Sequence, residues 1–335
     1  MELKHKKTDM KKLLAFIIIS IAMVSCYDEY ILDNVYTGIY FPYQNDVRTF
    51  VVGEGTVIEV GAALGGTMVN QVTRNVTYSL KDALITPALL TSMKSSSVSY
   101  IKDATAPVTQ LLPMPSNYYT LSNPNTMVIK SGQVSGTVVV KLDSTNFLND
   151  SLKTQYANYV IPFYIDAADA DSIIEPKRSN VVGFKFENML FGNYWHGGQT
   201  VINRPGKLDS VFTYKTAIPT AEANMWILKT AGPNTLYCNG YKDKASGTKN
   251  EMKLVLKGST VFVSAAPGST FTIQPDGASA FNRSKLLQNR KIFLKYQYTD
   301  AVSGFTYHCT DTLTFRNRFR DGINEWQDED PTHYK

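Results

Sequence analysis

Strict alternation of apolar and polar residues near the C-terminus constrains the fold more than any other feature of the sequence. Between residues 305 and 315, one face of an extended chain would carry Phe305, Tyr307, Cys309, Leu313 and Phe315, and the other would carry threonines and His308. A period of two fits a strand with one buried face and does not fit a helix. Residues 251–257 and 291–299 alternate in the same way. We therefore predict antiparallel strands with one face in contact with solvent.

The region from residue 188 to the C-terminus contains about eight such strands joined by short turns. Closing a meander of this kind into a barrel removes its exposed strand edges. We therefore predict an antiparallel β-barrel over residues 188–335, with a second β-sandwich as the alternative. In a barrel the opening segment, 191–198, and the closing segment, 311–318, would be neighbours.

The first half of the chain predicts a separate β domain over residues 35–187. Strand-like runs at 49–52, 57–64 and 72–80 are followed by a stretch without a sustained period, 83–112, which we interpret as a long surface excursion with one short helix, Pro87–Met93. From Leu112 onward, strands and glycine turns recur at the spacing of an immunoglobulin-like β-sandwich. The predicted fold class is all-β throughout.

The N-terminus predicts export. Lys11 and Lys12 precede a short apolar run, 13–25, which is followed by Cys26. A basic start, an apolar centre and small residues before a cut site make a secretory signal. As a helix this run would span about 20 Å of a ~30 Å hydrocarbon core, too little for a permanent membrane helix. We therefore assign residues 1–25 to a signal peptide.

The end of that run resembles a lipobox, in which cleavage exposes a cysteine that is then lipidated. The resemblance covers Met23 to Cys26 and departs from the usual pattern in having Met23 in place of Leu. It implies that acyl chains on Cys26 anchor the protein to the membrane, with residues 26–34 as a tether. The alternative is an ordinary signal peptide in which Cys26 has no role.

Acidic residues follow the cysteine directly, at Asp28 and Glu29. Acidic residues in this position resemble the export signal that sends lipoproteins of glycan-foraging Gram-negative bacteria to the cell surface. The expected location is therefore the outer face of the outer membrane.

Composition excludes a nucleic-acid partner. The chain has 335 residues, 43% hydrophobic and 19% charged, with a formal charge of +5. Residues 1–25 contain five lysines and two acidic residues, so their removal lowers the charge to about +2. The mature chain has no block of clustered Lys and Arg, which a nucleic-acid footprint requires.

The order of strands and turns resembles the N-terminal sandwich domain of a surface-lipoprotein family catalogued as a domain of unknown function. The resemblance covers Val35 to Phe186 and is best from Leu112 onward. The second half resembles the calycin-like, lipocalin-type barrel found beside that domain. The resemblance implies a non-catalytic surface lipoprotein of a polysaccharide-utilisation system, with a role in glycan binding or cell adhesion. Its expected partners are a polysaccharide or outer-membrane transporter components. The alternatives are a scaffolding lipoprotein that binds a protein and, with less support, an accessory of a glycoside hydrolase.

No motif predicts catalysis, a cofactor or a metal. The run 166–171 matches the acidic half of the chitinase-type signature, but the position that needs the catalytic acid is Ile173. We interpret the run as a polar turn, with calcium binding as the minor alternative. His196 and His308 would be close in a barrel, yet His308 and Cys309 would lie on opposite faces, and zinc needs three or four ligands. We therefore predict no enzyme.

Cys238 and Cys309 both fall on the apolar faces of their strands. Two thiols that point into one core permit a disulfide without requiring one. The alternative is that both are small buried side chains.

Flat aromatic side chains beside polar groups are typical of glycan sites. Trp195 is flanked by Tyr194, His196 and two glycines, and Trp326 lies in a polar segment. These four residues are the candidate ligand-binding set, with burial in the core as the alternative for Trp195. Trp226, between Met225 and Ile227, is predicted to be a core residue.

Overall fold

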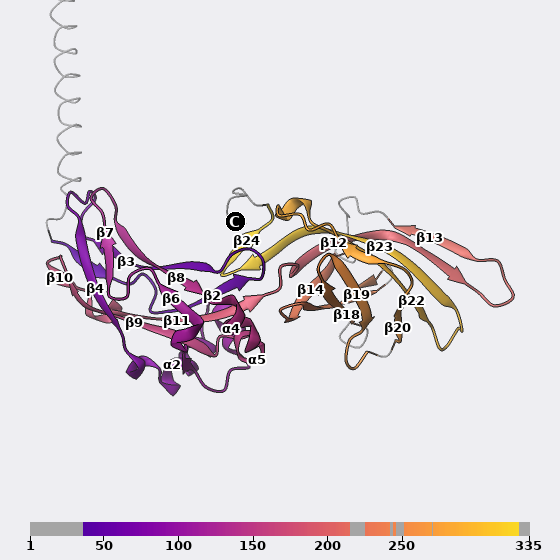
Figure 1. Ribbon diagram of the computed structural model, residues 1–335, viewed down its shortest axis with the longest axis horizontal. Coiled ribbons are helices and arrows are strands. Elements are labelled where there is room, and N and C mark those ends of the chain that lie inside the picture. Colours follow the sequence, from indigo (N-terminus) through magenta and orange to yellow (C-terminus); the bar gives the residue numbers. More distant parts are fainter. Residues whose placement is uncertain (1–35, 215–224, 242–243, 246–250, 270, 328–335) are drawn as a thin grey trace, which may run out of the picture.

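The computed structural model describes residues 36–214, 225–241, 244–245, 251–269 and 271–327. Figure 1 shows two β domains side by side along the long axis of the molecule. The strands of the first end at Glu187 and those of the second begin at Gly192. The predicted all-β class is confirmed. None of the helices within the described ranges is long and apolar enough to cross a membrane.

The first domain is a sandwich of two sheets. One sheet has the order β10-β1-β3-β8-β6 and the other has the order β2-β11-β9-β4-β7, with β5 beside β9. The strands of the first sheet are β1 (Gly38–Tyr40), β3 (Val57–Gly65), β6 (Tyr119–Leu121), β8 (Ser135–Leu142) and β10 (Ser172–Ile173). Those of the second are β2 (Asn45–Val51), β4 (Arg74–Leu80), β5 (Leu112–Pro113), β7 (Thr126–Ile129), β9 (Tyr159–Ala168) and β11 (Ser179–Glu187).

The core of the sandwich lies between these sheets. Val60 and Val138 from the first sheet pack against Val76, Phe163 and Phe184 from the second, and all five are buried. Full burial of such a side chain stabilises the fold by about 1.5–3 kcal/mol. The alternation along each strand places these apolar side chains between the two sheets, and their burial holds the sheets face to face.

The excursion between β4 and β5 is more structured than the sequence predicts. The predicted helix is present as α2 (Pro87–Lys94), whose N-terminus is capped by the Thr86 hydroxyl accepting from the amide of Leu89. A second helix, α3 (Ser99–Thr105), follows. Leu90 and Ile101 from the two helices pack with Val160 of β9 and others in a separate apolar cluster.

This cluster corrects our description of residues 83–112 as a surface excursion. Val160 and Val181 point away from the sandwich core, whereas their neighbours Ile161 and Val182 point into it. Strands that are apolar on both faces need a cover on each side. The helices supply that cover. The remaining helices within the described ranges are short: α4 (Ser144–Asn149), α5 (Ser151–Thr154), and the 3-10 turns at Asp82–Leu84, Ser116–Tyr118, Glu175–Lys177 and Leu287–Asn289.

The second domain is a closed antiparallel barrel. Its strands follow one another around the ring as β12 (Gly192–Asn203), β14 (Met225–Gly232), β15 (Thr235–Cys238), β18 (Met252–Lys257), β19 (Thr260–Ala265), β21 (Ser279–Phe281), β22 (Lys291–Thr299) and β23 (Thr306–Arg320). The ring closes because β23 also pairs with β12, from Asn193 opposite Asn317 to Asn203 opposite Thr306. The predicted contact between the opening and closing segments is thereby confirmed.

Shorter strands complete the second domain. They are β13 (Ser210–Tyr214), β16 (Gly240–Tyr241), β17 (Lys244–Ala245), β20 (Ile273–Pro275) and β24 (Ile323–Glu325). β13 extends the sheet beside the far half of β12, and β24 forms a hairpin with the end of β23. That hairpin turns through Asp321 and Gly322, both with positive φ, and lies against the sandwich (Figure 1).

The alternation in the sequence describes the barrel interior well. Leu254, Ile292, Leu294 and Leu313 are fully buried inside, as is Trp226, which was predicted to be a core residue. One position on the apolar face of β23 is not apolar: Asp311 is buried there with an exposed fraction of 1%.

Candidate functional site: the domain junction and the outer face of the barrel

The junction between the domains is held by buried charges. Arg318 of β23 donates to both carboxylate oxygens of Glu54 in the sandwich, at 2.9 and 2.6 Å, and Arg290 lies 2.6 Å from the same carboxylate. Arg318 also donates to Glu325 of β24 at 2.6 Å. Burial by itself would raise the pKa of Glu54, but the hydrogen bond and charge of Arg318, with those of Arg290, outweigh it and lower that pKa.

The β23–β24 hairpin adds a second attachment. The Asp321 carboxylate accepts from the backbone amide of Thr49 at 3.1 Å, and the ring of Tyr100 lies against Gly322. Tyr100 in turn donates to the buried Asp46 at 2.8 Å. Two independent sets of polar contacts therefore fix the barrel against the sandwich.

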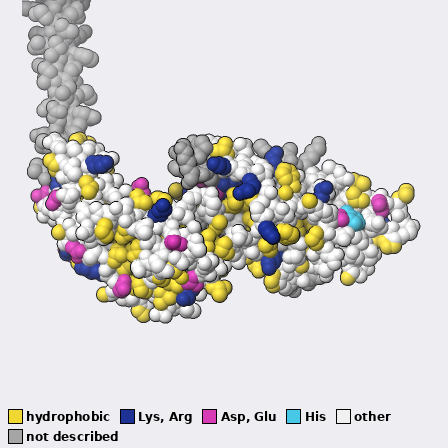
Figure 2. All heavy atoms as spheres, in the orientation of Figure 1, with side chains coloured by type: hydrophobic (Ala, Val, Ile, Leu, Met, Phe, Trp, Pro, Cys, Tyr) yellow, Lys and Arg dark blue, Asp and Glu magenta, His cyan; other side chains and the backbone are white. Residues whose placement is uncertain are grey.

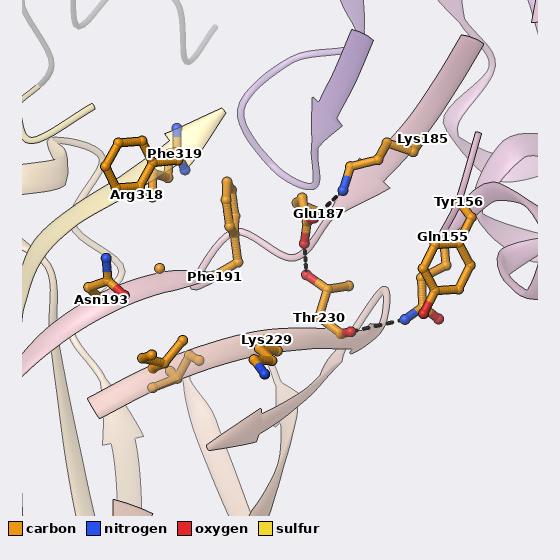
Figure 3. Close-up of a pocket in the computed structure, with 13 residues that line it drawn as sticks. Gln155, Tyr156, Lys185, Glu187, Phe191, Asn193, Lys229, Thr230, Arg318 and Phe319 are labelled. Atoms are coloured by element: carbon orange, nitrogen blue, oxygen red, sulfur yellow. Dashed lines mark hydrogen bonds and ion pairs between the residues drawn. The ribbon is translucent and has the colours of Figure 1, made fainter. Parts of the chain in front are cut away.

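A cleft of about 340 Å³ lies at this junction. Figure 3 shows one side of it as a row of joined polar groups: Lys185 pairs with Glu187, Glu187 accepts from the Thr230 hydroxyl, and Gln155 donates to the Thr230 carbonyl. The ion pair measures 2.5 Å and the Gln155 bond 3.0 Å. The other side is formed by Phe191, Asn193 and Phe319 (Figure 3).

Exposed aromatic rings border the cleft. Tyr156 is 37% exposed and Phe319 is 65% exposed. The volume is at the lower end of the range found for small-molecule sites. A cleft with open rings and several amide and hydroxyl groups has the chemistry that sugars require, since ring C–H groups pack on aromatic faces and hydroxyls bond to amides.

Three asparagine side chains connect the outer faces of β12, β23 and β24. Asn193 donates to Asn317 at 3.0 Å, and Asn317 donates to Asn324 at 2.8 Å. Each amide carries two donors and an acceptor, so this asparagine ladder retains hydrogen-bonding capacity at the surface. Asn193 itself lines the cleft, which makes the ladder a continuation of it.

Two of the sequence-predicted candidates lie beside the ladder. Trp195 is two residues after Asn193 on the same outer face of β12, half-buried, with the guanidinium of Arg316 4.6 Å from its ring centroid. Trp326 follows β24 two residues after Asn324 and is 59% exposed. The structure thus places both tryptophans near one polar strip, although they are far apart in the sequence.

The other two candidates point the opposite way. Tyr194 and His196 are buried inside the barrel, and the Tyr194 hydroxyl donates to the carbonyl of Leu190 at 3.1 Å. Our grouping of Tyr194, Trp195 and His196 into one ligand-binding set therefore needs correction, because successive residues of a strand point to opposite faces. Tyr194 and His196 belong to the barrel interior.

His196 is part of a buried polar cluster that the sequence analysis missed. Its imidazole stacks on Trp226 with centroids 3.7 Å apart and lies 3.2 Å from Asp311. The Asp311 carboxylate accepts from the hydroxyls of Tyr296, at 2.8 Å, and Tyr214. Burial and the nearby negative charge of Asp311 raise the pKa of both tyrosines. The sequence does contain a sign of this cluster, because Asp311 occupies an apolar position in the alternation of β23.

This cluster is a structural network of buried hydrogen bonds. Asp311 and Tyr296 are fully buried, and so is the Trp226 ring that closes the stack. A buried carboxylate is stable only when its oxygens are hydrogen-bonded. The two tyrosine hydroxyls meet that need and fix the interior of the barrel.

Cys238 and Cys309 are buried thiols and form no disulfide with each other. Cys238 lies inside the barrel, where burial raises the pKa of its thiol to about 12. Cys309 lies on the inner face of β23 and accepts a 3.6 Å contact from the Thr200 hydroxyl. The disulfide considered from the sequence is therefore absent, and the alternative of two small buried side chains describes them.

The acidic run at the end of β9 forms separate local contacts. Asp171 accepts from the amide and hydroxyl of Thr37, both at 2.7 Å, and Asp169 accepts from the amide and side chain of Asn75. Asp166 pairs with Lys81 at 3.1 Å. Over the residues that the structure describes, no group of three or more His, Cys, Asp or Glu side chains is arranged to hold a metal.

The predicted lipid anchor and export signal lie outside the described residues. This applies to Cys26, Asp28 and Glu29, and to the whole of the predicted signal peptide and tether. These assignments remain predictions from the sequence.

Fold and site together define a two-domain, all-β protein with a sandwich, a barrel and a cleft between them. A family model described only as "-like, N-terminal domain" matches residues 32–172, most of the sandwich and less than half of the chain. No curated protein matches the chain.

A solved structure shares this architecture, and others are similar at a lower level. A protein of unknown function from Bacteroides ovatus is similar with a TM-score of 0.62 and 19% identity, covering 88% of this chain and 98% of that one. A second from the same organism, also of unknown function, has a TM-score of 0.42 and 14% identity over 88% of this chain and 98% of that one. A third, described as a multidomain protein including DUF1735, has a TM-score of 0.41 and 12% identity over 87% and 100%. The first of these shows that the fold is shared.

Proposed function

We propose that this chain is a non-catalytic lipoprotein of the bacterial cell surface that binds glycan at its domain junction. The observation that carries the proposal is the strip formed by the asparagine ladder, the cleft and the exposed rings of Phe319 and Trp326. Amide groups in a row beside open aromatic faces match the alternating hydroxyl and C–H surfaces of a sugar chain.

The anchor part of the proposal rests on the sequence. The short apolar run that ends at Cys26 and the acidic pair Asp28 and Glu29 support export, lipidation and display on the outer membrane. The similarity of the fold to proteins from Bacteroides ovatus agrees with a cell-envelope location. On the cell surface the protein would pass glycan to, or assemble with, outer-membrane transporter components.

A scaffolding role is the second candidate, because the junction is rigid. The buried Glu54–Arg318 pair and the docked β23–β24 hairpin hold two β domains in one orientation, as a platform for a protein partner requires. Phe319 and Ile323 on that hairpin are both exposed and would suit such a contact.

Retention of the mature chain, residues 26–335, in affinity gels containing single polysaccharides tests glycan binding, after a glycan-array screen has chosen the polysaccharides. Trp326→Ala and Asn317→Ala should each weaken retention, and an aromatic anchor of this kind contributes about 1–3 kcal/mol. Trp195→Ala should have a smaller effect, because the ring is half-buried under Arg316.

Phe212→Ala is the matched control, because Phe212 is an exposed ring on β13, at the end of the barrel away from the sandwich (Figure 1). Equal retention of all variants, or loss of retention only where the thermal transition is also lost, would remove the strip from consideration. Capture of a protein partner without any glycan retention would favour the scaffolding role.

A further inference from the structure

Lys229, Tyr237 and Lys253 form a row across three neighbouring strands on the outside of the barrel. Lys229 of β14 lies directly opposite Tyr237 of β15, which lies directly opposite Lys253 of β18. Residues opposite each other in a ladder point to the same side of the sheet. Their neighbours Leu236 and Leu254 are buried inside the barrel, so this basic row faces outward.

The row holds two ammonium groups on either side of a phenol ring. Neighbouring strands lie about 4.8 Å apart, so the backbones that carry the two lysines are separated by roughly 10 Å. A ring placed between two cations over this distance can support one sugar while the lysines reach groups on either side of it. Lys257 continues the same face of β18.

Among the described residues, no acidic side chain forms an ion pair with Lys229, Lys253 or Lys257. Glu251 lies two residues before Lys253 on the same outward face, and its carboxylate forms no ion pair with Lys253 among the described residues. Figure 2 shows Lys and Arg side chains over the barrel near the junction, and most acidic side chains on the sandwich or at the far end of the barrel.

Lys229 also lines the cleft, so the basic row begins where the proposed glycan site lies. The other cations of the cleft are engaged, because Lys185 pairs with Glu187 and Arg318 pairs with Glu54. Among the described residues that line the cleft, Lys229 is therefore the cation that is available for a ligand.

Building on the proposed glycan site, we propose that the glycan bound at the junction is acidic. Lys229 and Lys253 hold carboxylate or sulfate groups of an anionic polysaccharide, and Tyr237 supports the sugar ring between them. A bilayer surface is a poorer fit, since anionic lipids are recognised by clusters of about 4–8 basic residues. A hydrogen bond from an ammonium group to a carboxylate or sulfate is also stronger than a hydrogen bond between neutral groups.

The test compares matched acidic and neutral polymers on the mature chain. The probes are polygalacturonate with its methyl-esterified form, and dextran sulfate with dextran, each in affinity gels at two salt concentrations. We expect retention by at least one acidic polymer, roughly tenfold stronger than by its neutral partner and weakened by salt, because exposed charges are screened within about 10 Å at 0.1 M.

The double variant Lys229→Gln with Lys253→Gln should lose most of that retention. Lys130→Gln with Lys141→Gln removes the same charge from exposed positions on the sandwich and should change retention little. Tyr237→Ala should weaken retention in high salt as well, since ring packing is not screened. Thermal transitions of all variants should match that of the unmodified chain.

Four results would overturn the proposal. Equal retention by acidic and neutral polymers, or equal losses in the two double variants, would leave glycan binding in place and remove the basic row from it. Binding to phosphatidylglycerol vesicles in preference to any polysaccharide would assign the row to membrane contact. If no glycan on the array bound the chain, the proposed function itself would be rejected.

Discussion

Arg318 of the barrel and Glu54 of the sandwich form a bidentate ion pair, with Nη1 to Oε1 at 2.9 Å and Nη2 to Oε2 at 2.6 Å. The residues are 264 positions apart in the sequence, and both side chains are almost completely buried. A buried charge left without its partner is strongly unfavourable. This pair therefore couples the stability of one domain to the position of the other.

Glu54→Gln should uncouple the domains. Removing one partner of a buried pair costs about 3–5 kcal/mol, because the remaining charges, here Arg318 and Arg290, stay buried. We expect urea unfolding followed by tryptophan fluorescence to shift to lower denaturant, since all three tryptophans follow residue 187. Glu175→Gln is the control: its side chain is 69% exposed, in a surface pair with Arg178 of the sandwich, and its loss should leave the midpoint nearly unchanged.

The same pair should make the junction sensitive to acid. The pKa of Glu54 is lower in the folded protein than in the unfolded chain. Its contribution to the free energy of unfolding is therefore present above the unfolded-state pKa of about 4.3 and is lost as pH falls through the folded-state value. Urea midpoints measured from pH 7 downward should fall more steeply for the unmodified chain than for Glu54→Gln. Parallel curves would contradict this assignment.

Gly240→Ala should destabilise the barrel. A Cβ at Gly240 would lie 2.3 Å from the Trp226 ring, which is held on its other face by His196 at 3.7 Å. Overpacking of this kind costs about 1–3 kcal/mol. Gly232→Ala is a suitable control, because its nearest contact would be an ordinary 3.6 Å from Thr235. Thermal transitions that fall equally in both variants would show that the stack does not limit the space.

Asp311→Leu should destabilise the barrel interior although it fits the alternation of β23. The change removes the acceptor of Tyr296 and Tyr214, and an unsatisfied buried hydroxyl costs about 1–3 kcal/mol. Ultraviolet titration of phenolate reports on the same contact. Tyr214 and Tyr296, whose pKa values are raised, should ionise in the native protein only at high pH, so their contribution to stability is present at neutral pH and lost as pH rises. Equal stability of Asp311→Leu and the unmodified chain would contradict the network.

Thiol labelling tests the state of the cysteines. In the mature chain treated with a thiol reagent at neutral pH, Cys238 and Cys309 should not react, since both are buried and the pKa of Cys238 is raised to about 12. Both should react after denaturation without a reductant. A requirement for reductant before the denatured chain reacts would indicate a disulfide instead.

Cys26→Ala should abolish lipidation, because the thioether that carries the lipid cannot form. Incorporation of an alkynyl fatty acid in living cells measures this directly, and undiminished label in the variant would reject the lipoprotein assignment. Changing Asp28 and Glu29 to Ala should leave the label intact and reduce the accessibility of the protein to protease added to whole cells.

The sequence by itself determined the architecture of the barrel, because the pattern along each strand decides which face is buried. Alternation at 291–299 and 305–315 identified the buried faces of β22 and β23, and Trp226 was correctly assigned to the core. The same period of two contradicted our own grouping of Tyr194, Trp195 and His196, since neighbours in a strand cannot share a face.

Only the tertiary structure decided which distant residues meet. The asparagine ladder joins Asn193 to Asn317 and Asn324, and Glu54 meets Arg318, through ring closure and domain docking. Such contacts depend on strand register and on the angle between domains, and neither can be inferred from the period of the sequence pattern. Asp311 depends on both levels. Its position in the alternation of β23 places it on the buried face, but its partner Tyr214 comes from a hairpin that packs there only in the folded barrel.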